Sequence, residues 1–170
     1  IKNLHISNSY ICGNSQVAAI AGYGSTIFDK CSVDETVFVT GNYTVGAIVG
    51  NSFSGHIKNS WSRANMASDN YADGGIVGVM DYGVIENSYT THYNIVDYSD
   101  GATITNCYYY NEPANNDGGI PLEDFASGEI AYLLQAGVPE EDIYDDDWNY
   151  IDTITPFVWG QKIGTDKFPV

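Results

Sequence analysis

The chain has 170 residues, of which 44% are hydrophobic, and its 22 acidic side chains against 6 Lys and Arg give a formal net charge of −16. The hydrophobic fraction is sufficient for a packed interior and argues against general disorder. The shortage of basic side chains excludes nucleic acids as expected partners, because binding them requires a basic surface that displaces phosphate counterions, and it also disfavours anionic membrane surfaces.

Two short phrases recur along the first two thirds of the chain. The first has the pattern small, small, Ile, small or branched, Gly; it occupies residues 18–22, 46–50 and 74–78, so its period is 28 residues. The second keeps step with the first and has clear copies at 57–61, 85–89 and 104–108, with weaker copies at 1–5 and 27–31. Self-similarity at such a period predicts an array of stacked structural repeats.

Each repeat contains three short β-type stretches. In the repeat 27–56 these are Ile27–Phe28, Thr36–Thr40 and Thr44–Val49, separated by turn formers and without a helical period. One such coil cannot bury its own inward-facing Ile and Val, whereas stacked coils bury them against each other. We therefore predict an all-β fold, a right-handed parallel β-helix (β-solenoid) of about four to five coils over residues 1–111, its handedness inferred from the general crossover preference.

Stacking places equivalent residues in columns, about 4.8 Å apart. Asn59, Asn87 and Asn106 hold equivalent positions in the second phrase. Because asparagine tolerates a left-handed backbone, we expect these residues at one corner, bonded to the backbone of the next coil. The small residues before Ile48 and Ile76 predict a close backbone bend at a second corner.

The same stacking predicts a column of aromatic side chains. Trp61, Tyr89 and Tyr108 occupy equivalent positions, and Tyr108, Tyr109 and Tyr110 must alternate between the two faces of a strand. An outward column, formed by Trp61, Tyr89 and Tyr108 with Tyr109 as a further exposed candidate, would bind sugar rings or a protein partner through flat apolar area. An inward column would be an aromatic core stack, which is the favoured arrangement because regular large apolar residues are usually buried.

Residues 112–170 differ in composition from the repeats. Residues 1–111 carry nine acidic and four basic side chains, a net of −5, whereas 112–170 carry thirteen and two, a net of −11. Residues 121–125 predict a turn, and one short helix is predicted at about 127–136 with Ser127 as its N-cap. Because an array exposes apolar surface and unpaired strands at its end, we assign 112–170 to a small mixed α/β C-terminal cap with an acidic loop.

Metal and cysteine chemistry have weak support. Asp142, Asp145, Asp146 and Asp147 could hold a calcium ion, since hard cations prefer several oxygen ligands, but a solvated acidic loop is the favoured interpretation. No other cofactor is indicated. Cys12, Cys31 and Cys107 form no CxxC pair, and the last two lie in or beside the second phrase, so we interpret those two as small buried apolar residues.

No catalytic motif is present, so we expect no enzymatic activity. The serious alternative is a polysaccharide hydrolase or lyase, because many are β-helices. A lyase needs cationic groups beside its base, and the only cations of the array, Lys2, Lys30, Lys58 and Arg63, define no cleft. A hydrolase needs two carboxylates about 5 to 10 Å apart. Candidates exist at Asp69, Asp73 and Asp81, but nothing distinguishes them.

The two phrases resemble the GLUG-motif repeats of bacterial surface proteins. Gly74–Gly78 with Ile85–Tyr89 fits that pattern best, whereas Ala18–Gly22 has alanines where the family has glycines. The closing stretches 127–134 and 159–170 are similar to the tail that often follows such repeats. The resemblance implies an extracellular module on the bacterial cell surface, and it transfers no catalytic residue.

These observations together predict a non-catalytic structural or adhesive module. Its expected partner is a host or bacterial surface protein or a glycan, bound through stacked side chains. A passive stalk that positions a neighbouring domain is a further alternative, since the chain begins inside a repeat phrase and is expected to be part of a longer multidomain protein. No apolar run is long enough to cross a bilayer, so membrane insertion is not expected.

Overall fold

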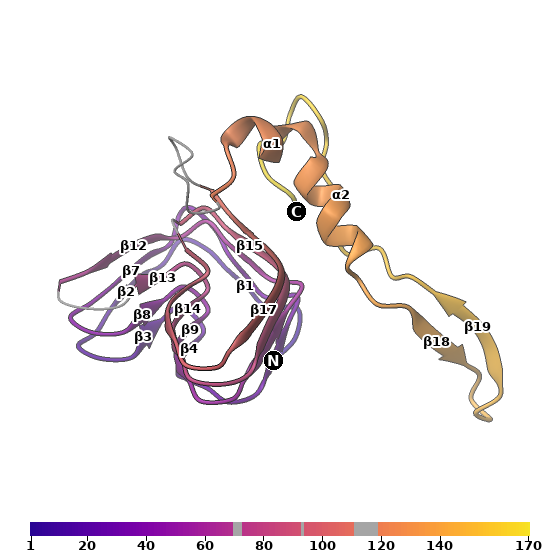
Figure 1. Cartoon of the computed structure of the whole chain (residues 1–170), viewed down its shortest axis with the longest axis horizontal. Helices are drawn as coiled ribbons and strands as arrows, with labels where there is room; N and C mark the ends of the chain where they lie inside the picture. The colour runs from indigo at the N-terminus through magenta and orange to yellow at the C-terminus, as the bar shows by residue number, and fades with distance from the viewer. Residues whose placement is uncertain (70–72, 93, 111–118) are drawn as a thin grey trace.

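The structure is a computed structural model that describes residues 1–69, 73–92, 94–110 and 119–170 (Figure 1). Of these residues 44% lie in strands and 9% in helices, so the prediction of a mostly β protein is confirmed. Among the described residues, four sheets are built only from parallel strands, and one antiparallel pair lies near the C-terminus. The predicted boundary between residues 111 and 112 lies outside the described residues.

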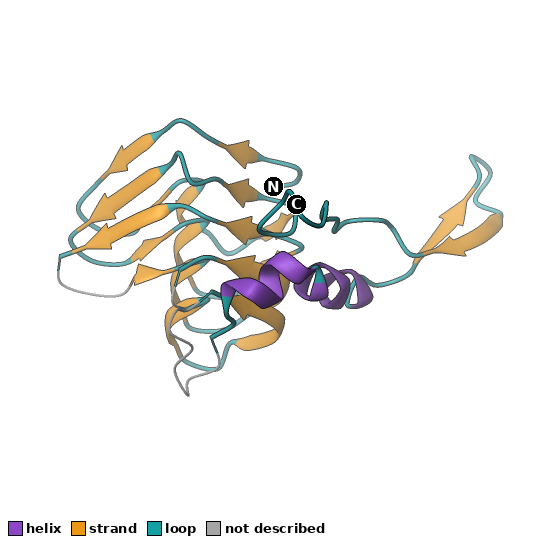
Figure 2. Ribbon diagram, turned by 90° about the horizontal axis from the view of Figure 1, so that it is seen from above, coloured by secondary structure: helices purple, strands orange, loops and turns teal. Residues whose placement is uncertain are grey.

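The chain visits the four parallel sheets in the same order several times. The first sheet contains β1 (His5–Ile6), β5 (Ile27–Asp29), β6 (Ser32–Val33), β10 (His56–Lys58), β11 (Trp61–Ser62), β15 (Val84–Thr90) and β17 (Thr103–Tyr109). The second contains β2 (Tyr10–Cys12), β7 (Phe38–Gly41) and β12 (Asn65–Ser68), and the third contains β3 (Val17–Ala18), β8 (Val45–Gly46) and β13 (Asp73–Gly74). The fourth contains β4 (Ala21–Tyr23), β9 (Val49–Ser52), β14 (Val77–Met80) and β16 (Val96–Ser99). Figure 2 shows strands of successive passes one beneath another.

Strand register follows the sequence repeat. Val49 pairs with Ala21 and with Val77, each 28 residues away, and Ile57 pairs with Ile85 at the same separation. One weak copy is aligned differently from the prediction. Phe28, not Ile27, pairs with Ile57, because only this register places the large ring of Phe28 in the interior and leaves Ile27 48% exposed.

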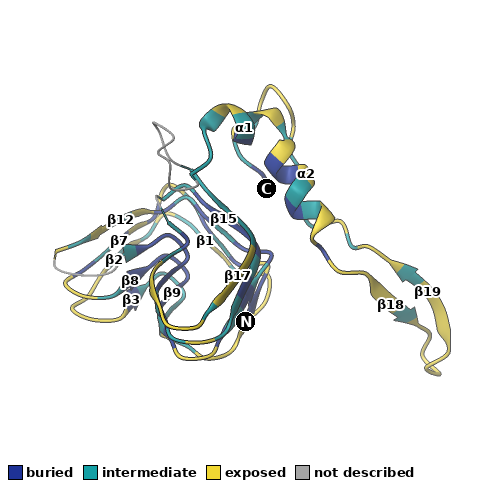
Figure 3. Cartoon of the chain, viewed as in Figure 1, coloured by how far each residue is buried: buried dark blue, intermediate teal, exposed yellow. Residues whose placement is uncertain are grey.

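The interior between the sheets is filled with aliphatic side chains, as the buried colouring of the strands in Figure 3 indicates. All four sheets contribute, and each pass packs against the passes beside it. The hydrophobic residues of this interior that have no exposed surface are Phe28, Cys31, Val33, Val37, Val39, Val45, Ala47, Ile48, Val49, Ile57, Ile76, Val77, Met80 and Ile85. We call this group the inner core.

The asparagine corner is formed as predicted, but its hydrogen bonds differ from those expected. Asn59, Asn87 and Asn106 have φ angles of 51°, 48° and 49°, which lie in the left-handed region. The amide of Asn106 donates to Oδ1 of Asn87 at 2.8 Å, so neighbouring passes are joined side chain to side chain. The amide of Asn87 donates at 2.6 Å to the carbonyl of Gly137. The corner therefore also holds the C-terminal segment.

This corner yields a prediction that separates backbone strain from hydrogen bonding. Asn87→Gly removes the side-chain bonds but accepts the left-handed backbone, whereas Asn87→Ala removes the same bonds and adds strain of about 1 kcal/mol. We expect the free energy of unfolding to decrease in the order wild type, Asn87→Gly, Asn87→Ala, measured by urea denaturation. Equal stability of the two variants would contradict the strain argument.

The C-terminal segment contains two helices rather than the one predicted. They are α1 (Leu122–Ser127) and α2 (Glu129–Ala136), separated by Gly128 with a φ of 89°. The predicted turn at 121–125 lies mostly in α1. There are two helices because the left-handed backbone of Gly128 interrupts the helical segment. Ser127 ends α1, and its hydroxyl still accepts a hydrogen bond from the Glu129 amide at 3.1 Å. Neither described helix is long and apolar enough to cross a membrane.

The helices lie beside β15 and β17, on the outer face of the first sheet, and a hairpin of β18 (Glu141–Tyr144) and β19 (Tyr150–Ile154) projects away from them (Figure 1). The expected acidic loop is thus the hairpin with its turn. We expected the segment to cover the end of the array, but its apolar contacts are with the outer face. The physical reason is the large aromatic surface that this face offers.

Candidate ligand-binding groove

The predicted equivalence of Trp61, Tyr89 and Tyr108 is confirmed by the strand register, in which Tyr89 pairs with both of the others. The rings of Trp61 and Tyr89 are stacked, with centroids 6.0 Å apart and an interplanar angle of 12°. Tyr109 lies on the opposite face, against the inner core, because successive residues of a strand alternate. Its inclusion as an exposed residue of the column was therefore wrong.

The column points away from the inner core and yet is covered. Tyr89 has no exposed surface, and Phe125, Trp159 and Phe168 surround its ring with centroids 5.7, 5.8 and 6.3 Å away. Its hydroxyl donates at 2.7 Å to the carbonyl of Pro169. The burial of the ring raises the pKa of Tyr89. We call the cluster formed by Tyr89 and these three rings the outer core. The column points outward, as one alternative predicted, but it is buried, as the other predicted. It is buried because the chain's own C-terminal segment covers it.

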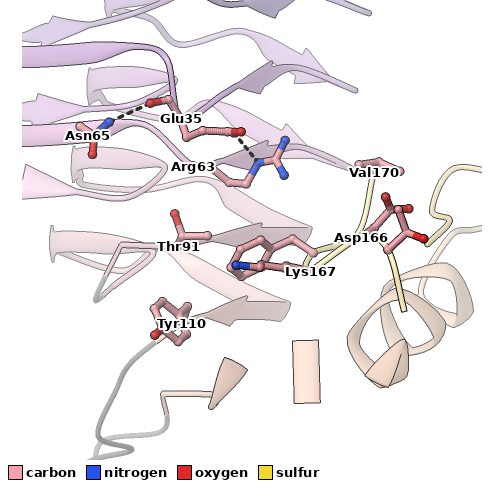
Figure 4. Close-up of a pocket in the computed structure, with 10 residues that line it drawn as sticks. Glu35, Arg63, Asn65, Thr91, Tyr110, Asp166, Lys167 and Val170 are labelled. Atoms are coloured by element: carbon pink, nitrogen blue, oxygen red, sulfur yellow. Dashed lines mark hydrogen bonds and ion pairs between the residues drawn. The ribbon is translucent and has the colours of Figure 1, made fainter. Parts of the chain in front are cut away.

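A cavity of about 670 Å³ opens next to the outer core, between the first and second sheets and the C-terminal residues (Figure 4). Such a volume lies within the range of small-molecule sites. The strand side is lined by Glu35, Arg63, Asn65, Thr91 and Tyr110, and the C-terminal side by Thr165, Asp166, Lys167, Phe168 and Val170. We call this cavity the groove.

Arg63 is fixed at the wall of the groove by two contacts. Its Nε lies 3.2 Å from Oε2 of Glu35, and its guanidinium carbon lies 4.5 Å above the centroid of the Trp61 ring. The side chain of Arg63 is only 22% exposed. Asn65 donates from Nδ2 to the carbonyl of Glu35 at 2.8 Å. The aromatic column therefore contributes to the groove indirectly, because the Trp61 ring supports the Arg63 side chain that lines it. The column does not itself form an exposed binding surface.

The C-terminal side adds an aromatic wall and a second cation. The rings of Tyr110 and Phe168 lie 6.2 Å apart in an edge-to-face arrangement. Asp166 accepts a hydrogen bond from the Lys162 amide at 2.7 Å, which orders the turn before Lys167. Lys167 is exposed and lines the groove. The groove thus combines two aromatic rings with amide, hydroxyl and charged groups.

Sequence reasoning singled out the aromatic column but missed most of the groove. The sequence shows Arg63 only as one of the cations of the array, and it gives no indication that Thr91, Lys167 and Phe168 line a common site. The one available signal was the spacing of Arg63, two residues after Trp61, which places both side chains near one face of the chain. Nothing local predicts that residues 165–170 return to this face.

Two of the four acidic candidates for calcium, Asp142 and Asp145, have other hydrogen-bond partners. The Asp145 carboxylate accepts hydrogen bonds from the Asn149 side chain and amide and from the Asp147 amide, which lower the pKa of Asp145. Asp142 accepts from the Thr153 hydroxyl at 2.7 Å. Within the described residues, no group of three or more His, Cys, Asp or Glu side chains could hold a metal ion. Asp146, like these two, belongs to the hairpin.

Carboxylates suited to hydrolysis are not distinguished by their surroundings. Asp73 lies 3.9 Å from Nε2 of His92, where burial lowers the pKa of that histidine. Glu35 and Asp166 both line the groove, but the Glu35 side chain is 64% exposed and is paired with Arg63. A general acid is usually kept protonated by an apolar environment. No such apolar enclosure surrounds the Glu35 carboxylate, which is exposed and paired with Arg63.

The cysteines provide a test of burial. Cys31 has no exposed surface, and burial raises the pKa of its thiol; burial also raises the pKa of Cys107 to about 12. Cys12 is exposed. Because the thiolate is the reactive form, we expect one thiol per chain to react with a disulfide reagent at pH 8 and all three in denaturant. Rapid reaction of either remaining thiol in the folded Cys12→Ser variant would contradict the structure.

Comparisons with family models, with curated proteins and with solved structures find no match for this chain.

Proposed function

We propose that this protein is a non-catalytic adhesive module that binds a glycan in the groove between the first sheet and the C-terminal residues. The observation that carries the proposal is the composition of the groove wall. Tyr110 and Phe168 offer apolar area to the faces of sugar rings, and Asn65, Thr91 and Thr165 offer hydrogen-bonding groups to sugar hydroxyls.

We further propose that residues 1–110 form a right-handed parallel β-helix. The recurrent order of the four sheets and the 28-residue register support this architecture. The right-handed sense follows from the general preference of parallel crossovers. A stack of passes would provide a rigid scaffold, which is the usual basis for positioning binding residues.

The proposed location is outside the cell, on a bacterial surface. It rests on the resemblance of residues 74–78 and 85–89 to GLUG-motif repeats and of residues 127–134 and 159–170 to the tail that follows them. A host or bacterial protein could occupy the same groove with a side chain, and a passive stalk would need no occupant. The groove favours a glycan over both, because it is a concave site with mixed aromatic and polar walls.

The proposal is tested by filling the groove. Thr91→Trp places a large ring in the cavity, and Ser54→Trp adds the same ring at an exposed position away from it. We expect wild type and Ser54→Trp to bind members of a glycan panel, and Thr91→Trp to lose at least tenfold in affinity while keeping the same thermal midpoint. Absence of glycan binding at millimolar concentration, or equal binding by Thr91→Trp, would overturn the proposal. Release of reducing sugar would instead favour the hydrolase alternative.

A further inference from the structure

The charged residues of the chain are unevenly distributed around the groove. Only six Lys and Arg are present in the whole sequence, and two of them, Arg63 and Lys167, line this one cavity. Glu35 and Asp166 line it as well, so the four formal charges sum to zero in a chain whose net charge is −16. The side chains that line the groove therefore carry no net charge, whereas the side chains of the whole chain are strongly acidic in sum.

The two anions of the groove are already engaged. Glu35 Oε2 lies 3.2 Å from Nε of Arg63, and Asp166 Oδ2 accepts the Lys162 amide at 2.7 Å. The two cations, Arg63 and Lys167, retain donor groups that these contacts do not involve. Figure 4 shows the terminal nitrogens of Arg63 turned toward the C-terminal residues, away from Glu35. Lys167 has no ion pair within the described part of the chain.

From this arrangement we infer that the groove selects sugars that carry a carboxylate, such as uronic acids, over their neutral counterparts; the inference rests on the glycan-binding function proposed above. A carboxylate accepts two parallel hydrogen bonds from the terminal nitrogens of a guanidinium, and an ammonium group adds a charge-assisted bond. The ring that carries the carboxylate lies against Tyr110 or Phe168.

The strongly negative chain limits which anions are suitable. At physiological ionic strength, charges farther than about 8 Å are largely screened, so a single carboxylate inside the groove interacts mainly with Arg63 and Lys167. A densely charged polyanion would extend beyond the groove and meet the acidic surface. The favoured ligand thus has one carboxylate on a terminal or isolated acidic sugar.

The test uses sugar pairs that differ only in the carboxylate. Methyl glucuronide is compared with methyl glucoside, and methyl galacturonide with methyl galactoside, by calorimetric titration at pH 7 and 150 mM NaCl. We expect the acidic member of at least one pair to bind at least tenfold more tightly. Lys167→Gln is expected to abolish this preference. Lys162→Gln, which removes the same charge outside the groove, is expected to retain the preference.

The outcomes separate the two proposals. If neutral and acidic sugars bind equally and Thr91→Trp abolishes both, the preference for a carboxylate is wrong while the glycan site stands. If Lys167→Gln and Lys162→Gln reduce the preference equally, the effect is one of overall charge and the inference is overturned. If none of the four sugars binds and the glycan panel is also negative, both proposals fail.

Discussion

Tyr89→Ala is expected to detach the C-terminal segment from the first sheet and to lower the free energy of unfolding by about 4 kcal/mol. The side chain has no exposed surface and lies at the centre of the outer core. Its removal leaves a cavity bordered by Phe125, Trp159 and Phe168, whose rings it contacts, and removes the hydrogen bond to Pro169. Tyr89 is the buried sheet residue of the apolar cluster that joins residues 120–170 to the sheet, so we expect the loss to be concentrated there.

The measurement combines urea denaturation with limited proteolysis mapped by mass spectrometry. Cleavage between residues 120 and 170 should accelerate in Tyr89→Ala, whereas residues within the strands should stay protected. Tyr89→Phe keeps the ring and loses only the hydroxyl bond, at a cost of about 1 kcal/mol. Tyr132→Ala, at a position 74% exposed on α2, serves as the control for loss of a tyrosine. Unchanged proteolysis in Tyr89→Ala would show that the outer core does not hold the segment.

The repeat made much of the strand arrangement predictable. Equivalent residues of stacked passes share one environment, so the spacing of Val49 and Val77 translates directly into a pairing between them. The left-handed corner was predictable for the same reason, since asparagine recurs where the backbone requires it. The error at Ile27 shows the limit of this logic, because burial of the larger Phe28 ring decided the register over the apparent phrase.

The cover over the aromatic column could not be predicted in this way. Phe125, Trp159 and Phe168 lie outside the repeats, and no periodicity relates them to Tyr89. Sequence patterns distinguish an apolar face from a polar one, but they do not identify what packs against it. The groove depends on the same long-range return, since Arg63 and Lys167 are more than a hundred residues apart in the sequence. The groove therefore exists only in the tertiary structure, and no sequence pattern predicts it.

Gly78→Ala is expected to destabilise the protein by about 3 kcal/mol through a single added methyl group. Gly78 lies in β14 and is aligned with Gly50 of β9 in the preceding pass. A Cβ atom on Gly78 would lie 2.6 Å from the carbonyl oxygen of Gly50 and 2.8 Å from that of Val45. Both are backbone atoms, so the clash is relieved only if neighbouring passes separate.

The matched control is Gly160→Ala, whose Cβ would lie 3.2 Å from the ring of Phe157. Phe157 is 82% exposed and can move aside, so we expect a change of less than about 0.5 kcal/mol, as for an ordinary surface substitution. Urea denaturation of both variants compares a rigid backbone contact with a flexible side-chain contact. If the two glycines tolerate alanine equally, the 28-residue phrase does not reflect close stacking of the backbone. If only Gly78 fails to tolerate it, the recurrent glycine is explained by the contact between passes.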